Sequence, residues 1–147
     1  MSDEKEMVQQ PARMKPPQDV QFREQQRLMV WRPRGILNER VVNKLIAFIG
    51  NIEATDKRPF DRFTETRHVE AVDLNFEYIF HIALYRRLSY SGRAPVKSAF
   101  LLSSLAKAHY SKMLEIIMQG SPLKVRVFED REKAAKWLGV SIEQLEH

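Results

Sequence analysis

The sequence predicts a single α/β domain in which a mostly parallel mixed sheet of about five strands is packed against about four helices. Segments typical of strands alternate along the chain with segments whose apolar residues recur at helical spacing. Residues 96–102 end in a continuous apolar run, which is typical of an interior strand, whereas residues 123–128 alternate like a strand with one wet face. Such alternation favours βαβ crossovers, and these bring strands together in parallel.

The N-terminal part of the chain is predicted to contain a tail, two strands and a helix. Residues 1–19 are polar and rich in proline, so we expect a flexible tail followed by a domain over residues 20–147. Residues 20–24 and 27–31 are predicted to form a strand pair, and Pro33 and Gly35 mark a turn. Asn38 is a suitable N-cap for the first helix. The apolar stripe of that helix is Leu37, Val41, Leu45, Phe48 and Ile52.

The remaining segments complete the predicted order ββαβαβαβα. Residues 60–64 form a short strand, residues 69–74 a loop, and residues 75–88 a helix. The strand over residues 96–102 precedes a helix over residues 105–119. The third helix is predicted to begin at an N-cap at Ser103 or Ser104 and to end at Gly120. The fourth is predicted to begin at Asp130 and to end at Gly139.

Composition excludes several function classes. The chain has no cysteine, which rules out disulfides and a thiol nucleophile and is compatible with a cytoplasmic protein. No apolar run approaches the ~20 residues that a membrane-spanning helix needs, and residues 1–19 lack the apolar core of a signal peptide. The net charge of +5 is spread among acidic residues rather than gathered in a basic run, so we expect neither membrane insertion nor nucleic-acid binding.

No motif for catalysis, a metal or a cofactor is present. None of the four histidines has a second ligand at metal-site spacing, and His68, in a predicted loop, is the one whose position is of interest. Asp61 and Asp73 fall near element ends, where capping explains them better than acid–base chemistry. The chain also lacks glycine-rich nucleotide motifs and the strand–turn–helix serine motif of hydrolases. We therefore expect a protein that is not an enzyme.

The order and spacing of these segments resemble the STAS (sulfate transporter and anti-sigma factor antagonist) domain, and in particular its bacterial SpoIIAA-like group. The resemblance covers residues 20–140. The matching segments are residues 32–37 (RPRGIL), 60–64 (FDRFT), 96–102 (VKSAFLL) with Ser103, and 127–128 (VF) followed by 132–138 (EKAAKWL). The resemblance implies an α/β fold that acts by binding.

One departure from the STAS pattern concerns its regulatory site. In anti-sigma factor antagonists a serine at the start of the second helix is phosphorylated. The corresponding segment here is Asp73-Leu74-Asn75, with leucine at the expected serine position, so the resemblance does not extend to that switch.

Two functions remain open from the sequence. The first is a regulatory protein–protein recognition module, with a homodimer through a symmetric patch as one form, whose contact surface is residues 69–76 with the adjacent end of the third helix. A basic, aromatic segment over residues 85–93 is a second place where a phosphate or an acidic partner could bind. The candidate surface residues are Asp73, Leu74, Asn75, Arg86, Arg87, Tyr90 and Arg93. The alternative is a carrier or sensor that holds a small molecule or lipid between helices and sheet, since STAS-related folds resemble lipid-binding CRAL-TRIO domains.

Overall fold

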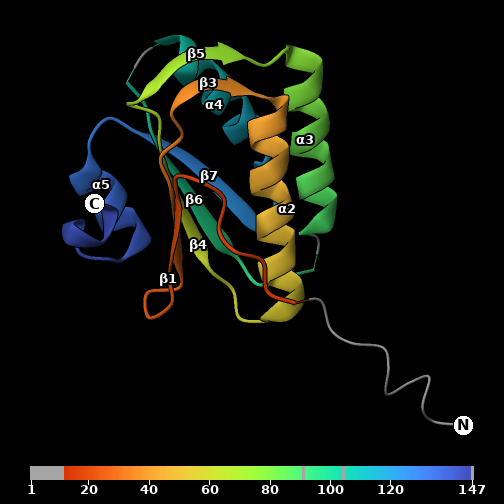
Figure 1. The fold of residues 1–147 in the computed structure, drawn as a ribbon, viewed down its shortest axis with the longest axis vertical. Helices are drawn as coiled ribbons and strands as arrows, with labels where there is room; N and C mark the ends of the chain where they lie inside the picture. Colours follow the sequence, from red (N-terminus) through yellow and green to blue (C-terminus); the bar gives the residue numbers. More distant parts are fainter. Residues whose placement is uncertain (1–11, 91, 104, 147) are drawn as a thin grey trace, which may run out of the picture.

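A five-stranded mixed sheet forms the centre of the protein. The computed structural model describes residues 12–90, 92–103 and 105–146 (Figure 1). The strand order is β1 (Val20–Arg23), β2 (Leu28–Trp31), β4 (Asp61–Glu65), β6 (Val96–Leu101) and β7 (Leu123–Phe128). β1 is antiparallel to β2, and every other neighbouring pair is parallel. The predicted mostly parallel mixed sheet is therefore confirmed, with β6 inside it and β7 at its edge.

Helices cover both faces of this sheet. One face is packed against α2 (Glu39–Thr55), α3 (Phe76–Ser89) and α4 (Leu105–Ile117), and the other against α5 (Arg131–Leu138) with the short 3₁₀ helix η1 (Ile142–Leu145) (Figure 1). β2 illustrates how a strand in this position is buried along its whole length. Met29 and Trp31 pack with α2, whereas Leu28 and Val30 pack with α5, because successive strand residues point to opposite faces.

Side-chain caps define the helix ends much as the sequence predicts. The side chain of Asn38 accepts a hydrogen bond from the backbone N–H of Val41 (3.0 Å) and begins α2. Asp130 caps α5 in the same way, through the N–H of Lys133 (2.8 Å). Gly139 ends α5 in the left-handed conformation, with φ of 75°, which glycine adopts without steric cost. Of the two serines predicted to cap α4, Ser104 lies outside the described residues.

The predicted order of elements lacks two short strands that the structure contains. Residues 69–74 are predicted as a loop, but Val69–Asp73 is a strand, β5, and it pairs in parallel with β3 (Gly35–Asn38) in a separate two-stranded sheet. Neither segment has a clear alternating pattern. Each is stabilised by hydrogen bonds to a partner more than thirty residues away, and this pairing is not visible in a local window of sequence.

The segment that precedes β1 contacts the domain. The backbone N–H of Met14 donates to the side-chain carbonyl of Asn51 on α2 (2.7 Å), and the amide of Asn51 donates to the carbonyl of Ala12 (3.0 Å). Arg13 also pairs with Glu24. The predicted flexible tail thus has a described part, residues 12–19, that meets α2, while residues 1–11 lie outside the described residues.

Candidate functional site

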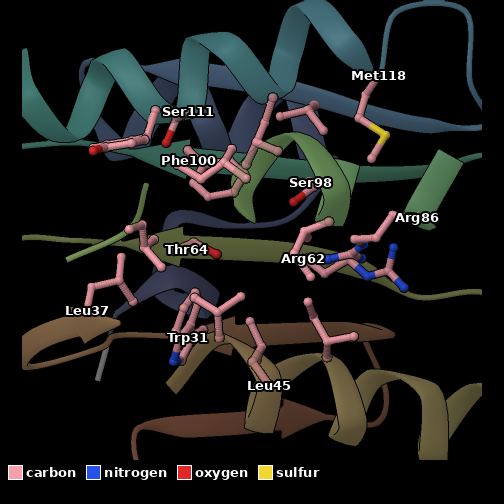
Figure 2. A pocket seen from close by; sticks show the side chains of 18 of the residues that line it. Trp31, Leu37, Leu45, Arg62, Thr64, Arg86, Ser98, Phe100, Ser111 and Met118 are labelled. Atoms are coloured by element: carbon pink, nitrogen blue, oxygen red, sulfur yellow. The ribbon is translucent and has the colours of Figure 1, made fainter. Parts of the chain in front are cut away.

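A cavity of about 120 Å³ lies between the sheet and the three helices α2, α3 and α4 (Figure 2). Its floor is made by alternate residues of four strands, since the period of two sends every second side chain to the same face. These floor residues are Met29 and Trp31 of β2, Arg62 and Thr64 of β4, Ser98 and Phe100 of β6, and Leu123 and Val125 of β7.

Apolar side chains from the helices form most of the remaining wall. α2 contributes Leu45 and Ile49, and α3 contributes Ile79 and Ile82. Polar groups are few, and the main ones are the hydroxyl side chains of Thr64, Ser98 and Ser111 and the guanidinium groups of Arg62 and Arg86 (Figure 2). An apolar enclosure with a small number of convergent polar groups is the usual form of a small-molecule site.

Arg62 is the most unusual residue in this wall, because its side chain is only 2% exposed. Its Nη2 donates to the hydroxyl of Tyr90 (2.7 Å) and to the carboxylate of Glu53 (3.2 Å). Its guanidinium also lies over the ring of Phe60, 4.4 Å from the ring centroid. The other two nitrogens, Nε and Nη1, are buried without a hydrogen-bond partner. Such unpaired buried donors are costly and uncommon in native proteins.

Positive charge exceeds negative charge around Tyr90. The guanidinium groups of Arg62, Arg86 and Arg93 lie 5.2, 5.6 and 5.5 Å from the centroid of its ring. Glu53 is the carboxylate that pairs with two of them, at 3.2 Å from Arg62 and 3.5 Å from Arg93. Three cations therefore share one anion within this cluster. Burial lowers the pKa of Arg62, and the neighbouring charge of Arg86 lowers it further, against the opposing effects of Tyr90 and Glu53.

The candidate surface residues separate into two groups at opposite ends of α3. Asp73, Leu74 and Asn75 precede the helix, whereas Arg86, Arg87, Tyr90 and Arg93 lie at or after its C-terminal turn. At about 1.5 Å per residue the two ends are roughly 20 Å apart, so they form no common surface. The structure brings together Arg86, Tyr90 and Arg93 but directs Arg87 to the backbone carbonyl of Ile117 (3.4 Å).

Two members of the candidate surface are buried. Tyr90 is 3% exposed, since its ring packs with Ala83, Val96 and Met118. Leu74 is 9% exposed and lines the cavity. The residue at the serine position of anti-sigma factor antagonists thus faces the interior here. Asn75 is the N-cap of α3, where its side chain accepts from the N–H of Tyr78 (2.7 Å), and Asp73 ends β5.

The other residues that the sequence singled out have structural roles or exposed positions. The carboxylate of Asp61 accepts from the backbone N–H of Lys97 (2.8 Å) and so ties β4 to β6. The side chain of His68 is exposed. Among the described residues no group of histidine and acidic side chains could hold a metal ion, and no helix could cross a membrane. The side chain of His109, and the whole of His147, lie outside the described part of the chain.

Glu65, the residue after Thr64 on β4, joins a second charged cluster at the C-terminal ends of the strands. Its carboxylate is 3% exposed and accepts from Nη2 of Arg131 (2.6 and 3.0 Å) and from Nε of Arg32 (3.1 Å). The network joins the end of β2, the end of β4 and the start of α5. Because these donors occupy both oxygens of the carboxylate, we interpret the network as a structural connection.

Arg62 is a site residue that sequence reasoning missed, because residues 60–64 were interpreted only as a strand. The available signal was a charged residue beside Phe63 in a segment that resembles the central strand of the STAS pattern. A strand position that is buried on both faces does not accept a long cation without a specific reason.

The fold defined by this sheet and its helices is that of a SpoIIAA-like α/β protein. No protein-family model matches the sequence, and no curated protein does. Among solved structures the chain is similar to an uncharacterised protein of the DUF3478 family with a SpoIIAA-like fold from Shewanella loihica PV-4. The two are 14% identical, with a TM-score of 0.50 over 76% of this chain and 83% of that one. The predicted resemblance is therefore confirmed at the level of fold.

Proposed function

We propose that this protein is a non-enzymatic SpoIIAA-like domain that binds a small molecule in the cavity beneath α2, α3 and α4, as a carrier or sensor. The supporting observation is the combination of a partly open, mostly apolar cavity of about 120 Å³ with a buried, partly unpaired Arg62 in its wall. An apolar void alone would be explained as loose packing. A buried and incompletely paired cation in the wall is instead a feature that a ligand with a polar or charged group would stabilise.

The size of the cavity limits the ligand. Apolar cavities of about 150 Å³ admit benzene, so a volume of about 120 Å³ accommodates a group of roughly six heavy atoms. Longer molecules would extend beyond the enclosure. The lack of cysteine supports placing this activity in the cytoplasm.

Native mass spectrometry of the freshly purified protein, before and after denaturation, tests the proposal directly. We expect an additional mass that is released on unfolding. Where none is released, we expect saturable binding of toluene or 1-hexanol, measured by NMR titration. Ser111→Leu should block binding, because Ser111 is 6% exposed and lines the cavity from α4. Lys112→Leu, at the exposed neighbouring position, is the matched control. Binding that is unchanged in Ser111→Leu would overturn the proposal.

A second candidate function, recognition of a protein partner, has a separate observation in its favour. α3 carries an apolar stripe on its outer side, spaced four residues apart. Its members are Phe76, Phe80, Leu84 and Leu88, which are 60%, 40%, 39% and 78% exposed. A helix with apolar residues on two sides normally packs against other protein surfaces on both sides. The stripe therefore supports a docking surface on α3.

A second copy of the chain is the partner that the stripe fits best. If two α3 helices cross antiparallel about their midpoints, Phe76 of one lies opposite Leu88 of the other, and Phe80 lies opposite Leu84. The same symmetry sets the exposed Glu77 near the exposed Arg87. An interface of this kind is self-complementary, as a two-fold dimer requires.

Sedimentation analysis over a range of concentrations tests the dimer. Glu77→Arg and Arg87→Glu should each weaken association, and the double exchange should restore it, because the opposite charges are then paired again. Monomers at every concentration, or a double exchange no better than either single variant, would exclude this interface.

A further inference from the structure

We propose that the ligand of the cavity is a monocarboxylate with a short apolar tail, whose carboxylate lies against the guanidinium groups of Arg62 and Arg86. This inference rests on the proposed function, since it names the class of molecule that the same cavity takes. Three features of the site support it: the incomplete pairing of Arg62, the unmatched charge and the shape of the cavity.

Arg62 is incompletely paired, which favours an anion beside its guanidinium group. Nη2 is already used by Tyr90 and Glu53, whereas Nε and Nη1 are buried and have no partner. An ionised acceptor forms stronger hydrogen bonds with a guanidinium than a neutral acceptor does. A neutral ligand would leave the excess positive charge of the cluster unmatched, and a cation would be repelled. The incomplete pairing of Arg62 therefore favours a ligand with a negatively charged oxygen.

The charge of the cluster favours an anion for an independent reason. Arg62 and Arg86 both line the cavity, lie at the same end of it, and both donate to the hydroxyl of Tyr90 (Figure 2). Glu53 pairs with Arg62 from one side but is not part of the cavity wall. One added negative charge near the two guanidinium groups would reduce their mutual repulsion at a site where little water screens it.

The part of the cavity away from the arginines limits what the rest of the ligand can be. Beyond the arginine end the wall is mostly apolar, with Trp31, Leu37 and Phe100 among the side chains that form it (Figure 2). A phosphate or sulfate without a tail would leave this space unfilled. By the comparison with benzene, this space takes a group of roughly six heavy atoms, which the five-carbon tail of hexanoate fills. Hydroxyl side chains such as that of Ser98 offer further donors to the carboxylate.

The experiment compares hexanoate with 1-hexanol on the unmodified protein, by NMR titration at constant ionic strength. We expect hexanoate to bind about tenfold more tightly or better, because hydrogen bonds to a charged group contribute that much more than those to a neutral one. In Arg62→Met this preference should disappear while 1-hexanol still binds. Arg126→Met is the control, since it removes one charge from the same sheet at a position outside the cavity.

The results of this experiment separate the two proposals. Equal affinities for hexanoate and 1-hexanol, both lost in Ser111→Leu, would overturn the carboxylate and leave the binding function standing. Hexanoate binding that persists in Ser111→Leu would place the anion outside the cavity and also overturn the inference. Absence of binding by both molecules, with no mass released on unfolding, would overturn the proposed function as well.

Discussion

Replacing Glu65 with glutamine should remove much of the stability of the domain. The carboxylate of Glu65 is the anion that Arg32 and Arg131 share, and the side chain of Arg32 is 7% exposed. Glu65→Gln keeps the shape of the side chain but leaves Arg32 buried without a counter-ion. Breaking a buried ion pair from one side costs about 3 kcal/mol or more. For a chain of this size that corresponds to a fall in the thermal midpoint of roughly 6–12 °C.

The pH dependence of the same variant provides a second test. Burial alone would raise the pKa of Glu65, but hydrogen bonds from Arg131 and Arg32, and their charges, outweigh it and lower that pKa below its usual value. A carboxyl with a lowered pKa stabilises the folded state above its unfolded-state pKa of about 4.3, and the contribution is lost as the pH falls through the folded-state value. The difference in the free energy of unfolding between wild type and Glu65→Gln should therefore stay constant from neutral pH down to about 5 and shrink below about 4.

Thermal and chemical unfolding between about pH 3 and pH 7 measure both effects. Glu70→Gln is the matched control, because Glu70 is an exposed glutamate on β5. Two results would refute the argument that Glu65 neutralises Arg32. One is a thermal midpoint of Glu65→Gln less than about 2 °C below wild type at neutral pH, and the other is a stability difference between the two proteins that grows toward low pH.

Three further substitutions test other parts of the structure. Asn75→Ala should lower the free energy of unfolding by about 1 kcal/mol, since it removes the N-cap of α3. Denaturant titration should show that the control, Asp73→Ala, changes this free energy little, and equal losses of stability in the two variants would argue against the cap. Phe63→Ala should cost about 3–5 kcal/mol because the ring is fully buried between β2, β6 and α5; a loss below about 1 kcal/mol would contradict this packing. Arg62→Met should leave the free energy of unfolding within about 1 kcal/mol of wild type, or raise it, because it removes a buried charge that is only partly paired. A loss above about 3 kcal/mol would mean that Arg62 is held for stability.

The class of the fold could be predicted from local features of the sequence. The apolar run at the end of residues 96–102, the alternation over residues 123–128 and the caps at Asn38 and Asp130 are local signals, and each predicted an element that the structure contains. Local signals of this kind work because strand and helix periods, and capping hydrogen bonds, depend on residues only a few positions apart. The candidate recognition residues were also chosen locally, from helix ends and a basic segment. Their positions at opposite ends of α3 could not be judged in this way.

Which residues meet depends on the packing of distant segments. β3 and β5 pair across more than thirty residues, so neither is visible without its partner. Arg62 is polar in sequence and buried in the fold, because β4 lies between β2 and β6 and both faces of the sheet are covered. The cavity likewise depends on how α2, α3 and α4 pack over alternate residues of four strands. The free energies of these contacts come from burial and charge in three dimensions rather than from the order of residues along the chain.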